Sequence, residues 1–407
     1  MAQDKDQKTL NVPPLRFTGF TGDWKKTTLG EIGKTFNGLT GKNSNDFGQG
    51  SPYITYKSIF DNSKVDISRV EYVTITDNER IKSAQNVVRL GDIFFTTSSE
   101  TPTEVGMTSV LLDGIEDCYL NSFCFGYRLS NKEETLPEYF RFYLRASVIR
   151  NKLSILAQGS TRFNISKNEV MRMGINLPNS SEQEKIAALL SCIDERITTQ
   201  NKIIEKYESL IKGLNNILLY ATGGKSVCLG DILLERSERS RTNNQHEVLS
   251  STVKGIFSQR EYFSKDIASE NNVGYKIIRL HDVVLSPQNL WMGNINYNDR
   301  FEIGIVSPSY KVFSIADGYD NQFVAAMLKT HRALYSYMMV SEQGASIVRR
   351  NLNMEAFSQL VFKIPSLDKQ REIGCAISLL KSQLKTANKI IRAYTSQKQY
   401  LLCQMFI

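Results

Sequence analysis

The tetrapeptide Asn201-Lys202-Ile203-Ile204 occurs a second time, 187 residues further along the chain, as Asn388-Lys389-Ile390-Ile391. The same offset of 187 residues relates three further pairs. They are Leu177-Pro178 with Ile364-Pro365, Gln183 with Gln370, and Tyr207 with Tyr394. Several matches at one spacing are the signature of an internal repeat. The sequence therefore predicts a chain built from two copies of one unit.

The residues around each tetrapeptide predict a long helix. Positions spaced alternately by four and three form a mostly apolar seam, as in a coiled coil: Ile186, Leu190, Ile193, Ile197, Gln200, Ile204, Tyr207, Ile211, Leu214 and Leu218. The offset gives the second seam: Ile373, Ile377, Leu380, Leu384, Ala387, Ile391, Tyr394, Lys398, Leu401 and Met405. Each seam alone would expose a wide apolar stripe, so we expect the two helices to pack together, antiparallel, with Gln200 facing Ala387. Gln200 either fixes the register there or is merely tolerated.

Upstream of each helix, further matches extend the repeat over the whole chain. They keep their order with small changes in length: Leu29-Gly30-Glu31-Ile32 with Leu229-Gly230-Asp231-Ile232, Leu90-Gly91-Asp92-Ile93 with Leu280-His281-Asp282-Val283, and Gln158-Gly159-Ser160 with Gln343-Gly344-Ala345. Short β-branched and aromatic runs predict strands at 71–75, 92–97, 275–279 and 310–315, and helical patterns cover 138–150 and 321–340. The predicted fold is α/β, with two similar globular domains joined by two long helices that form an antiparallel coiled coil, in a pseudo-two-fold internal duplication.

Punctuating residues place the domain boundaries. Prolines precede both long helices, Ser181 and Asp368 are plausible N-caps, and Gly223-Gly224 ends the first helix. The predicted organisation is an N-terminal tail (1–14), a first globular domain (15–178), a first coiled-coil helix (179–222), a second globular domain (223–365) and a second coiled-coil helix (366–407).

Composition restricts the function class. The chain has 407 residues and a net charge of +8, and residues 366–407 hold 7 basic and 2 acidic side chains. This mild excess is compatible with a polyanionic partner and equally with a solvated helix face. With no apolar run of membrane-spanning length or signal-peptide type, we expect a cytoplasmic protein without a membrane partner. Scattered cysteines and only three histidines predict no metal site.

Searches for catalytic motifs fail. Gly30 to Thr35 ends like a phosphate-binding loop, but Thr28 stands where its first glycine is required. Asn11 to Leu15 differs from the Asn- or Asp-Pro-Pro-aromatic loop of adenine methyltransferases by an inserted valine and a final leucine. We therefore predict no catalytic residue, although catalytic residues need not be contiguous.

Taken together, Leu15-Arg16-Phe17 with Trp24, the Leu90 to Thr96 strand, Gln158 to Thr161 and the Leu177 to Gln183 helix start resemble the specificity subunits of type I restriction-modification enzymes. The resemblance implies a non-catalytic subunit with two target-recognition domains, each reading half of a bipartite double-stranded DNA sequence. The paired helices would act as a ruler between the two halves. It also implies two methyltransferase subunits and restriction and translocation subunits as partners, with S-adenosylmethionine, ATP and Mg²⁺ belonging to those partners and no cofactor in this chain.

Loops after predicted strands are where hydrogen-bonding side chains reach a DNA groove. The predicted DNA-binding residues of the first half are Lys42, Tyr56, Lys57, Ser98, Ser99, Glu100, Ser160, Thr161 and Arg162. Those of the second half are Arg239, Arg241, Gln288, Asn289, Trp291, Ser346, Arg349 and Arg350. Two alternatives remain open at this stage: a coiled-coil protein-interaction scaffold that never touches DNA, and a self-sufficient DNA methyltransferase or nuclease.

Overall fold

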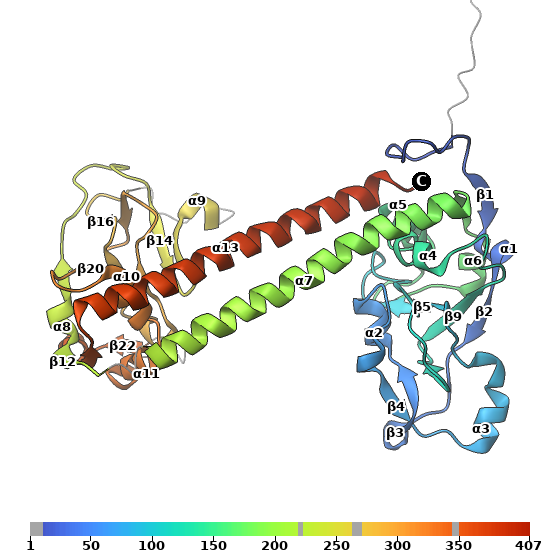
Figure 1. Cartoon of the computed structure of the whole chain (residues 1–407), viewed down its shortest axis with the longest axis horizontal. Coiled ribbons are helices and arrows are strands. Elements are labelled where there is room, and N and C mark those ends of the chain that lie inside the picture. Colours follow the sequence, from blue (N-terminus) through green and yellow to red (C-terminus); the bar gives the residue numbers. More distant parts are fainter. Residues whose placement is uncertain (1–10, 219–222, 263–270, 344–349) are drawn as a thin grey trace, which may run out of the picture. The chain divides into compact units, whose positions relative to one another are not determined.

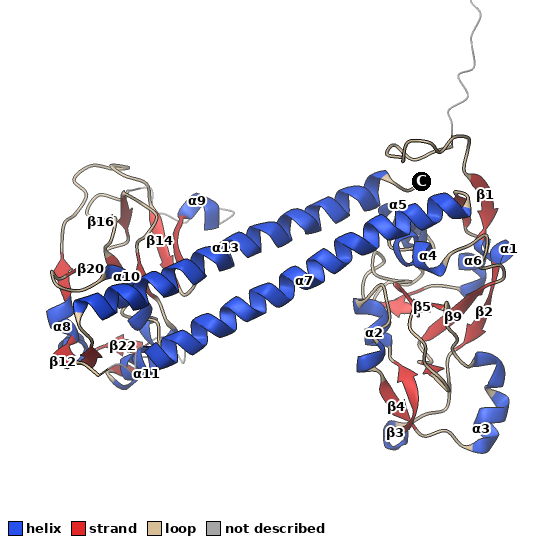
Figure 2. Cartoon of the chain, viewed as in Figure 1, coloured by secondary structure: helices blue, strands red, loops and turns tan. Residues whose placement is uncertain are grey.

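The computed structural model describes residues 11–218, 223–262, 271–343 and 350–407 (Figure 1). Its contacts divide the chain into two compact units, Met1–Thr199 with Ile390–Ile407, and Gln200–Lys389. The second unit is thus one continuous segment, whereas the first is completed by a segment from much later in the chain. Both units mix helices and strands, as the α/β prediction requires (Figure 2).

An antiparallel four-stranded sheet organises the first unit. Its order is β2 (Gly33–Asn37), β9 (Cys124–Leu129), β5 (Ile93–Thr96) and β7 (Thr108–Val110). Smaller sheets are β4 (Glu71–Val73), β3 (Phe47–Ile54) and β8 (Tyr119–Leu120); β1 (Lys25–Thr28) with β11 (Gly174–Leu177); and β6 (Ser98–Ser99) with β10 (Phe163–Asn164). The shorter helices are α1 (Leu29–Ile32), α2 (Tyr56–Asp61), α3 (Asp77–Lys82), α4 (Pro137–Tyr143), α5 (Ser147–Ile155) and α6 (Lys167–Arg172).

The second unit repeats this plan. Its four-stranded sheet is β13 (Leu233–Arg236), β20 (Lys311–Ile315), β17 (Val283–Leu285) and β18 (Ile295–Tyr297). The strand pairs are β12 (Lys225–Cys228) with β23 (Val361–Ile364), β14 (Leu249–Thr252) with β15 (Gly255–Ser258), β16 (Lys276–Arg279) with β19 (Ile303–Val306), and β21 (Ser341–Gln343) with β22 (Arg350–Leu352). Its shorter helices are α8 (Leu229–Ile232), α9 (Gln259–Tyr262), α10 (Asn321–Met327), α11 (His331–Met339) and α12 (Met354–Ser358).

Close backbone approach explains one repeated motif. Leu29 and Leu229 are fully buried at the start of α1 and α8. The glycine that follows each leucine faces a neighbouring helix: a Cβ on Gly30 would come within 3.1 Å of the Met171 carbonyl oxygen in α6, and one on Gly230 within 3.0 Å of Ser358 in α12. The leucine supplies core packing, and the glycine lets the two helices touch.

Gly91, a second glycine of the repeat, is replaced by His281 in the second copy. Gly91 has φ +87°, a left-handed conformation that favours glycine, and His281 adopts the same region with φ +75°. The His281 ring stacks on Tyr297 with ring centroids 5.7 Å apart, and its Nδ1 is hydrogen-bonded to the Tyr297 hydroxyl. This side-chain contact offsets the backbone strain that a non-glycine residue incurs there.

Two predicted helices are broken in the structure, so this part of the secondary-structure prediction was wrong. The 138–150 pattern divides into α4 and α5 at Ala146, which is extended with ψ 148°. The 321–340 pattern divides into α10 and α11 where the Thr330 side chain accepts a hydrogen bond from the Ala333 amide and starts a new helix. In both cases apolar residues continue across the break, and hydrophobic periodicity alone does not detect it.

The two long helices are α7 (Ser180–Leu218) and α13 (Leu367–Gln404). Asn179, not Ser181, caps α7, because its Oδ1 accepts from the Glu182 amide at 2.9 Å. Asp368 lies inside the first turn of α13 rather than before it. Each predicted cap lies two residues after the observed N-cap position, which is the usual uncertainty at helix ends.

Within each unit the two long helices run antiparallel. In the first unit, Asp194 of α7 pairs with Lys398 of α13 at 2.5 Å. Arg196, two residues later in α7, lies over the ring of Tyr394, one turn earlier in α13. In the second unit, the Gln200 side chain donates to the Ala387 carbonyl at 3.3 Å, the contact that the antiparallel register predicts. Every seam residue whose side chain is described is buried or half-buried, and the side chain of Leu218 lies outside the described residues. The seam is therefore a packing surface in both units.

Residues near both ends of the described chain complete the first unit. The Leu15 amide donates to the Gln404 carbonyl at 3.0 Å. Phe406 is 1% exposed and its ring lies 5.7 Å from that of Tyr139 and 5.6 Å from that of Tyr143. The C-terminal end of α13 thus belongs to the hydrophobic core of the first unit.

Candidate nucleic-acid interface

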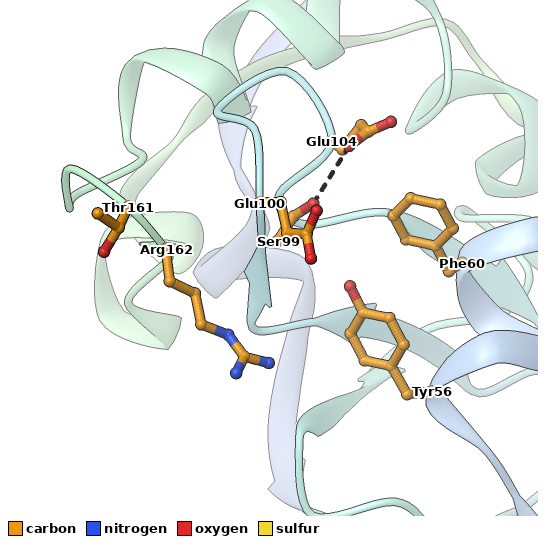
Figure 3. A pocket seen from close by; sticks show the side chains of 7 residues that line it. All are labelled: Tyr56, Phe60, Ser99, Glu100, Glu104, Thr161 and Arg162. Carbon is orange, nitrogen blue, oxygen red and sulfur yellow. Dashed lines mark hydrogen bonds between the residues drawn. The ribbon is translucent and has the colours of Figure 1, made fainter.

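A pocket of about 710 Å³ opens in the first unit where strand pairing brings two distant loops together (Figure 3). In the antiparallel pair of β6 and β10, Ser99 lies opposite Phe163 and Ser98 opposite Asn164. The residues just before β10 therefore lie beside those just after β6. The first turn of α2 completes the wall, and the lining residues are Tyr56, Phe60, Ser99, Glu100, Glu104, Thr161 and Arg162.

Hydrogen bonds and ring packing hold this pocket in shape. The Tyr56 hydroxyl donates to the Ser98 carbonyl at 2.6 Å, and its ring stacks on Phe60 with centroids 5.8 Å apart. Burial raises the pKa of Tyr56, while the nearby Arg162 opposes that rise. The phenol is therefore protonated at neutral pH and able to donate.

Arg150 supports the loop that carries Glu104 through hydrogen bonds to its backbone. Arg150 of α5 donates to the carbonyls of Thr103, Val105 and Gly106 at 2.8, 2.6 and 2.6 Å. Burial lowers the pKa of Arg150 to about 10, so the guanidinium is still charged at neutral pH. Because a buried guanidinium must fill its donors, these bonds fix the loop beside the pocket.

Glu100 and Arg162 are the charged groups of this pocket that remain available. Both side chains are exposed, and within the described residues neither forms a hydrogen bond or an ion pair. Glu104, by contrast, accepts from the Thr101 hydroxyl at 2.7 Å. The pocket thus presents one free anion and one free cation over a wall that carries an aromatic ring.

The second unit has a pocket of about 420 Å³ in the corresponding place, after β17, which matches β5 of the first unit. It is lined by Ser251, Thr252, Val253, Lys254, Ser286, Gln288, Asn289, Asn294, Ser309 and Tyr310. Its polar groups are mostly amides and hydroxyls, with one lysine and no carboxylate. The two pockets therefore occupy matching positions but differ in chemistry.

A buried amide network supports the second pocket. The Ser251 hydroxyl donates to Asn294 Oδ1 at 2.9 Å and accepts from Asn296 Nδ2 at 2.7 Å. Lys329 donates to Asn296 Oδ1 at 2.6 Å, and burial lowers its pKa to about 8. Asn289 Oδ1, at the wall, is buried and has no hydrogen-bond partner in the described structure. An unpaired buried acceptor costs free energy that a donor on a ligand can recover.

The structure groups some of the predicted DNA-binding residues and separates others. Tyr56, Ser99, Glu100, Thr161 and Arg162 share the first pocket, and Gln288 and Asn289 share the second. Ser98 contributes its carbonyl to the first, while Lys57 and Ser160 are exposed outside the set of lining residues. Every one of these contacts with DNA stays a prediction.

Three predicted basic residues make internal contacts instead. The Lys42 ammonium pairs with Glu79 at 2.7 Å and is 7% exposed. Arg239 donates to the Gly274 carbonyl at 2.9 Å, and Arg350 donates to the Met338 carbonyl at 3.2 Å while its guanidinium lies over the Trp291 ring. Arg241 is exposed. Ser346 and Arg349 lie outside the described residues.

The sequence prediction missed several lining residues. In the first pocket, Phe60 lies one turn of α2 beyond the predicted Tyr56, and Glu104 lies in the same loop as the predicted Glu100. In the second pocket, Ser251 to Lys254 belong to a hairpin between β14 and β15. Thr252 to Gly255 bears a turn signal that could have identified that hairpin. Among the described residues, no group of three or more His, Cys, Asp or Glu side chains could hold a metal ion, and no helix is long and apolar enough to span a membrane.

Comparison with known proteins relates this chain to one family. Residues 21–209 match the model of the type I restriction modification DNA specificity domain. A protein of Methanocaldococcus jannaschii, named as a specificity subunit of a type I restriction enzyme, is 28% identical over 206 residues, which are 47% of each chain. The match thus spans about half the length of this curated relative.

Solved structures share the fold over almost the whole chain. The crystal structure of the S subunit of a type I restriction-modification system from M. genitalium has a TM-score of 0.61 at 15% identity and covers 97% of this chain and 99% of that one. A second chain, from a structural study of complex assembly in a type I restriction-modification system, has a TM-score of 0.50 at 16% identity, with 93% and 96% covered.

The second unit lies mostly outside the matched residues 21–209, and its four-stranded sheet repeats the plan of the first. The chain thus resembles the specificity subunits of type I restriction-modification systems: nearly half of it matches their DNA specificity domain, and almost all of it shares the fold of a solved S subunit.

Proposed function

We propose that the chain is the DNA-reading subunit of a type I restriction-modification complex, in which each unit reads one half of a bipartite duplex target. The observation that carries the proposal is the pair of pockets at matching positions of the two units, after β5 and after β17. Both are lined by side chains that offer hydrogen bonds, which are the groups that read base edges.

The differences between the pockets support two unlike half-sites. Carboxylate, guanidinium and aromatic groups line the first, whereas amides and hydroxyls line the second. Side chains of different hydrogen-bonding type favour different bases. A duplicated fold with unlike pockets would therefore read an asymmetric sequence, and the long helices that link the units would set the spacer between its halves.

The proposal assigns no reaction to this chain. Methyltransferase subunits, with S-adenosylmethionine, would modify adenines in the target, and restriction and translocation subunits would supply the ATP- and Mg²⁺-dependent steps. We also propose that the complex acts in the cytoplasm, where its DNA substrate lies.

Selection from a random duplex library tests the proposal. The full chain is coexpressed with a modification subunit of its own system, and bound DNA is sequenced after several rounds. We expect two short conserved blocks separated by a spacer of constant length. Retention of DNA without any conserved block would contradict sequence reading, and no retention of DNA at all would favour the scaffold alternative. Methyl transfer by the chain alone would contradict the assignment of catalysis to partners.

A negative charge introduced into one pocket at a time tests whether the two units read separate half-sites. Thr161→Glu in the first pocket and Lys254→Glu in the second each place a negative charge where DNA would lie, so each should weaken selection at one block only. Lys82→Glu is a matched control, since Lys82 is an exposed lysine of α3 outside both pockets. Loss of both blocks with any one variant would contradict separate reading by the two units.

A further inference from the structure

The free charges of the first pocket come from two loops that strand pairing holds together. Glu100 follows β6 and Arg162 precedes β10, and these two strands are paired. Figure 3 shows Arg162 extending from its loop toward the side of the pocket where Tyr56 lies. Arg162 and Tyr56 line the same pocket.

Nothing in the described structure occupies these two groups. Glu104, on the same loop as Glu100, is held by Thr101 and Ser99 at 2.7 and 3.4 Å, and so serves the loop itself. Within the part of the chain that the structure describes, Glu100 and Arg162 form no such hydrogen bond. The Arg162 guanidinium offers hydrogen-bond donors and the Glu100 carboxylate offers acceptors, and the two share one opening without pairing with each other. This arrangement suits a ligand that presents both acceptors and a donor.

Among base pairs in the major groove, G·C has this complementary pattern. Guanine presents two acceptors, N7 and O6, to which arginine donates in a bidentate manner, and cytosine presents the N4 amino donor, which a carboxylate accepts. At A·T in the same orientation, the adenine N6 amino group would face the guanidinium and the thymine O4 would face the carboxylate. Both contacts would then oppose like with like.

We infer that the first pocket reads a G·C base pair, with Arg162 contacting guanine and Glu100 contacting cytosine. The inference rests on the proposed DNA-reading function and adds the identity of one base pair to it. The second pocket offers a contrast on the same fold, because it holds Gln288 and Asn289 and no carboxylate. Among the described residues that line the two pockets, the combination that G·C requires occurs in the first.

The test repeats the library selection with variants in the complete complex. The wild type should enrich a block with one fixed G·C pair, at which other base pairs are bound about tenfold or more weakly. Arg162→Met and Glu100→Gln should each relax that same base pair. Glu100→Gln should in particular weaken the discrimination against an A·T pair, since the glutamine amide can donate to thymine O4 whereas the carboxylate cannot.

Internal controls separate recognition from folding. Arg172→Met removes the same charge from an exposed position of α6 and should change neither block. The block read by the second unit should remain sharp in both pocket variants, which reports that the complex is folded. Relaxation at two different base pairs, or a first block without a fixed G·C pair, would overturn the inference while leaving the proposed function intact. Absence of both blocks in the wild type would overturn the proposed function itself.

Discussion

Gln183 and Gln370, which lie 187 positions apart, make the same hydrogen bonds in their own units. Each side chain donates through Nε2 to the carbonyl of the proline five residues earlier, at 2.9 and 3.0 Å, and each Oε1 accepts from the backbone at the start of another helix. The acceptor bonds come from the Leu136 amide before α4 and from the Asp320 amide before α10. These buried glutamines therefore fix the start of a long helix against the module that it follows.

Removing either glutamine should destabilise its unit. Gln183→Ala or Gln370→Ala leaves buried backbone groups without partners, at a cost of about 1 to 3 kcal/mol each. The two effects should add, because the residues share no contact. Urea unfolding measures them, with Gln397→Ala as an exposed control on α13. Effects no larger than that of the control would contradict the anchoring role.

The buried aspartates of the repeat use different arginines. Asp92 is 1% exposed and bonded to Arg128 of β9, whose guanidinium also lies over Phe36 of β2. In the second unit Asp282 is bonded to Arg236 of β13. Tyr127 and Phe313 occupy matching positions, because each lies opposite the residue that follows the buried aspartate. Phe36 follows the residue of β2 that lies opposite Tyr127, and Arg236 follows the residue of β13 that lies opposite Phe313. Arg236 is therefore the counterpart of Phe36. The arginine thus lies on a different strand in each unit, whereas the buried aspartate keeps its position.

This exchange predicts a rescue. Arg128→Ser should cost about 2 to 3 kcal/mol, because it leaves Asp92 buried without its cation. Adding Phe36→Arg copies the arrangement of the second unit and should restore part of that loss, despite the lost apolar packing. Denaturant unfolding of the three proteins measures the effect. Arg172→Ser, at an exposed ion pair, should change stability by less than about 0.5 kcal/mol. A double variant no more stable than Arg128→Ser would refute the exchange.

Lys329 should make stability depend on pH in the alkaline range. Its pKa is about 8 in the folded protein, below the ordinary value of 10.5, because burial disfavours the charge. Between these values the unfolded chain binds more protons, so stability rises with pH across that window. Relative to Lys329→Met, the wild type should gain about 1 to 2 kcal/mol between pH 7 and pH 9.5. Unfolding curves at both pH values measure this difference, and a constant or falling difference would contradict it.

Phe406 should contribute strongly to the first unit. Its ring packs among Tyr139 and Tyr143 in the core, so Phe406→Ala should cost about 3 to 5 kcal/mol. Tyr400→Ala, at a position that is 59% exposed on the same helix, is the control and should have a small effect. Calorimetry of both variants provides the comparison. Equal effects would show that the end of α13 adds little to the core.

The sequence predicted the repeated features and the strands at 71–75, 92–97, 275–279 and 310–315, but few of the contacts between distant elements. The duplication, the seams and the Gln200 contact with Ala387 follow from spacing, because coiled-coil packing depends on positions along a single helix. The breaks at Ala146 and Thr330 do not, since apolar residues continue through them. The ion pair of Lys42 with Glu79 joins residues 37 positions apart, which composition does not reveal. The pockets depend on strand pairing of this kind, so the sequence identified some of their lining residues, such as Tyr56 and Arg162, but not Phe60.

The closure of the first unit by Leu401, Met405 and Phe406 has a consequence for biosynthesis. On the ribosome, the N-terminal module is synthesised first, yet its core lacks these side chains until residue 406 has been made. The second unit is a single segment, from Gln200 to Lys389, and has all its core residues earlier. The module that is translated second can thus finish folding first, while the earlier one waits as an incomplete intermediate with exposed apolar surface.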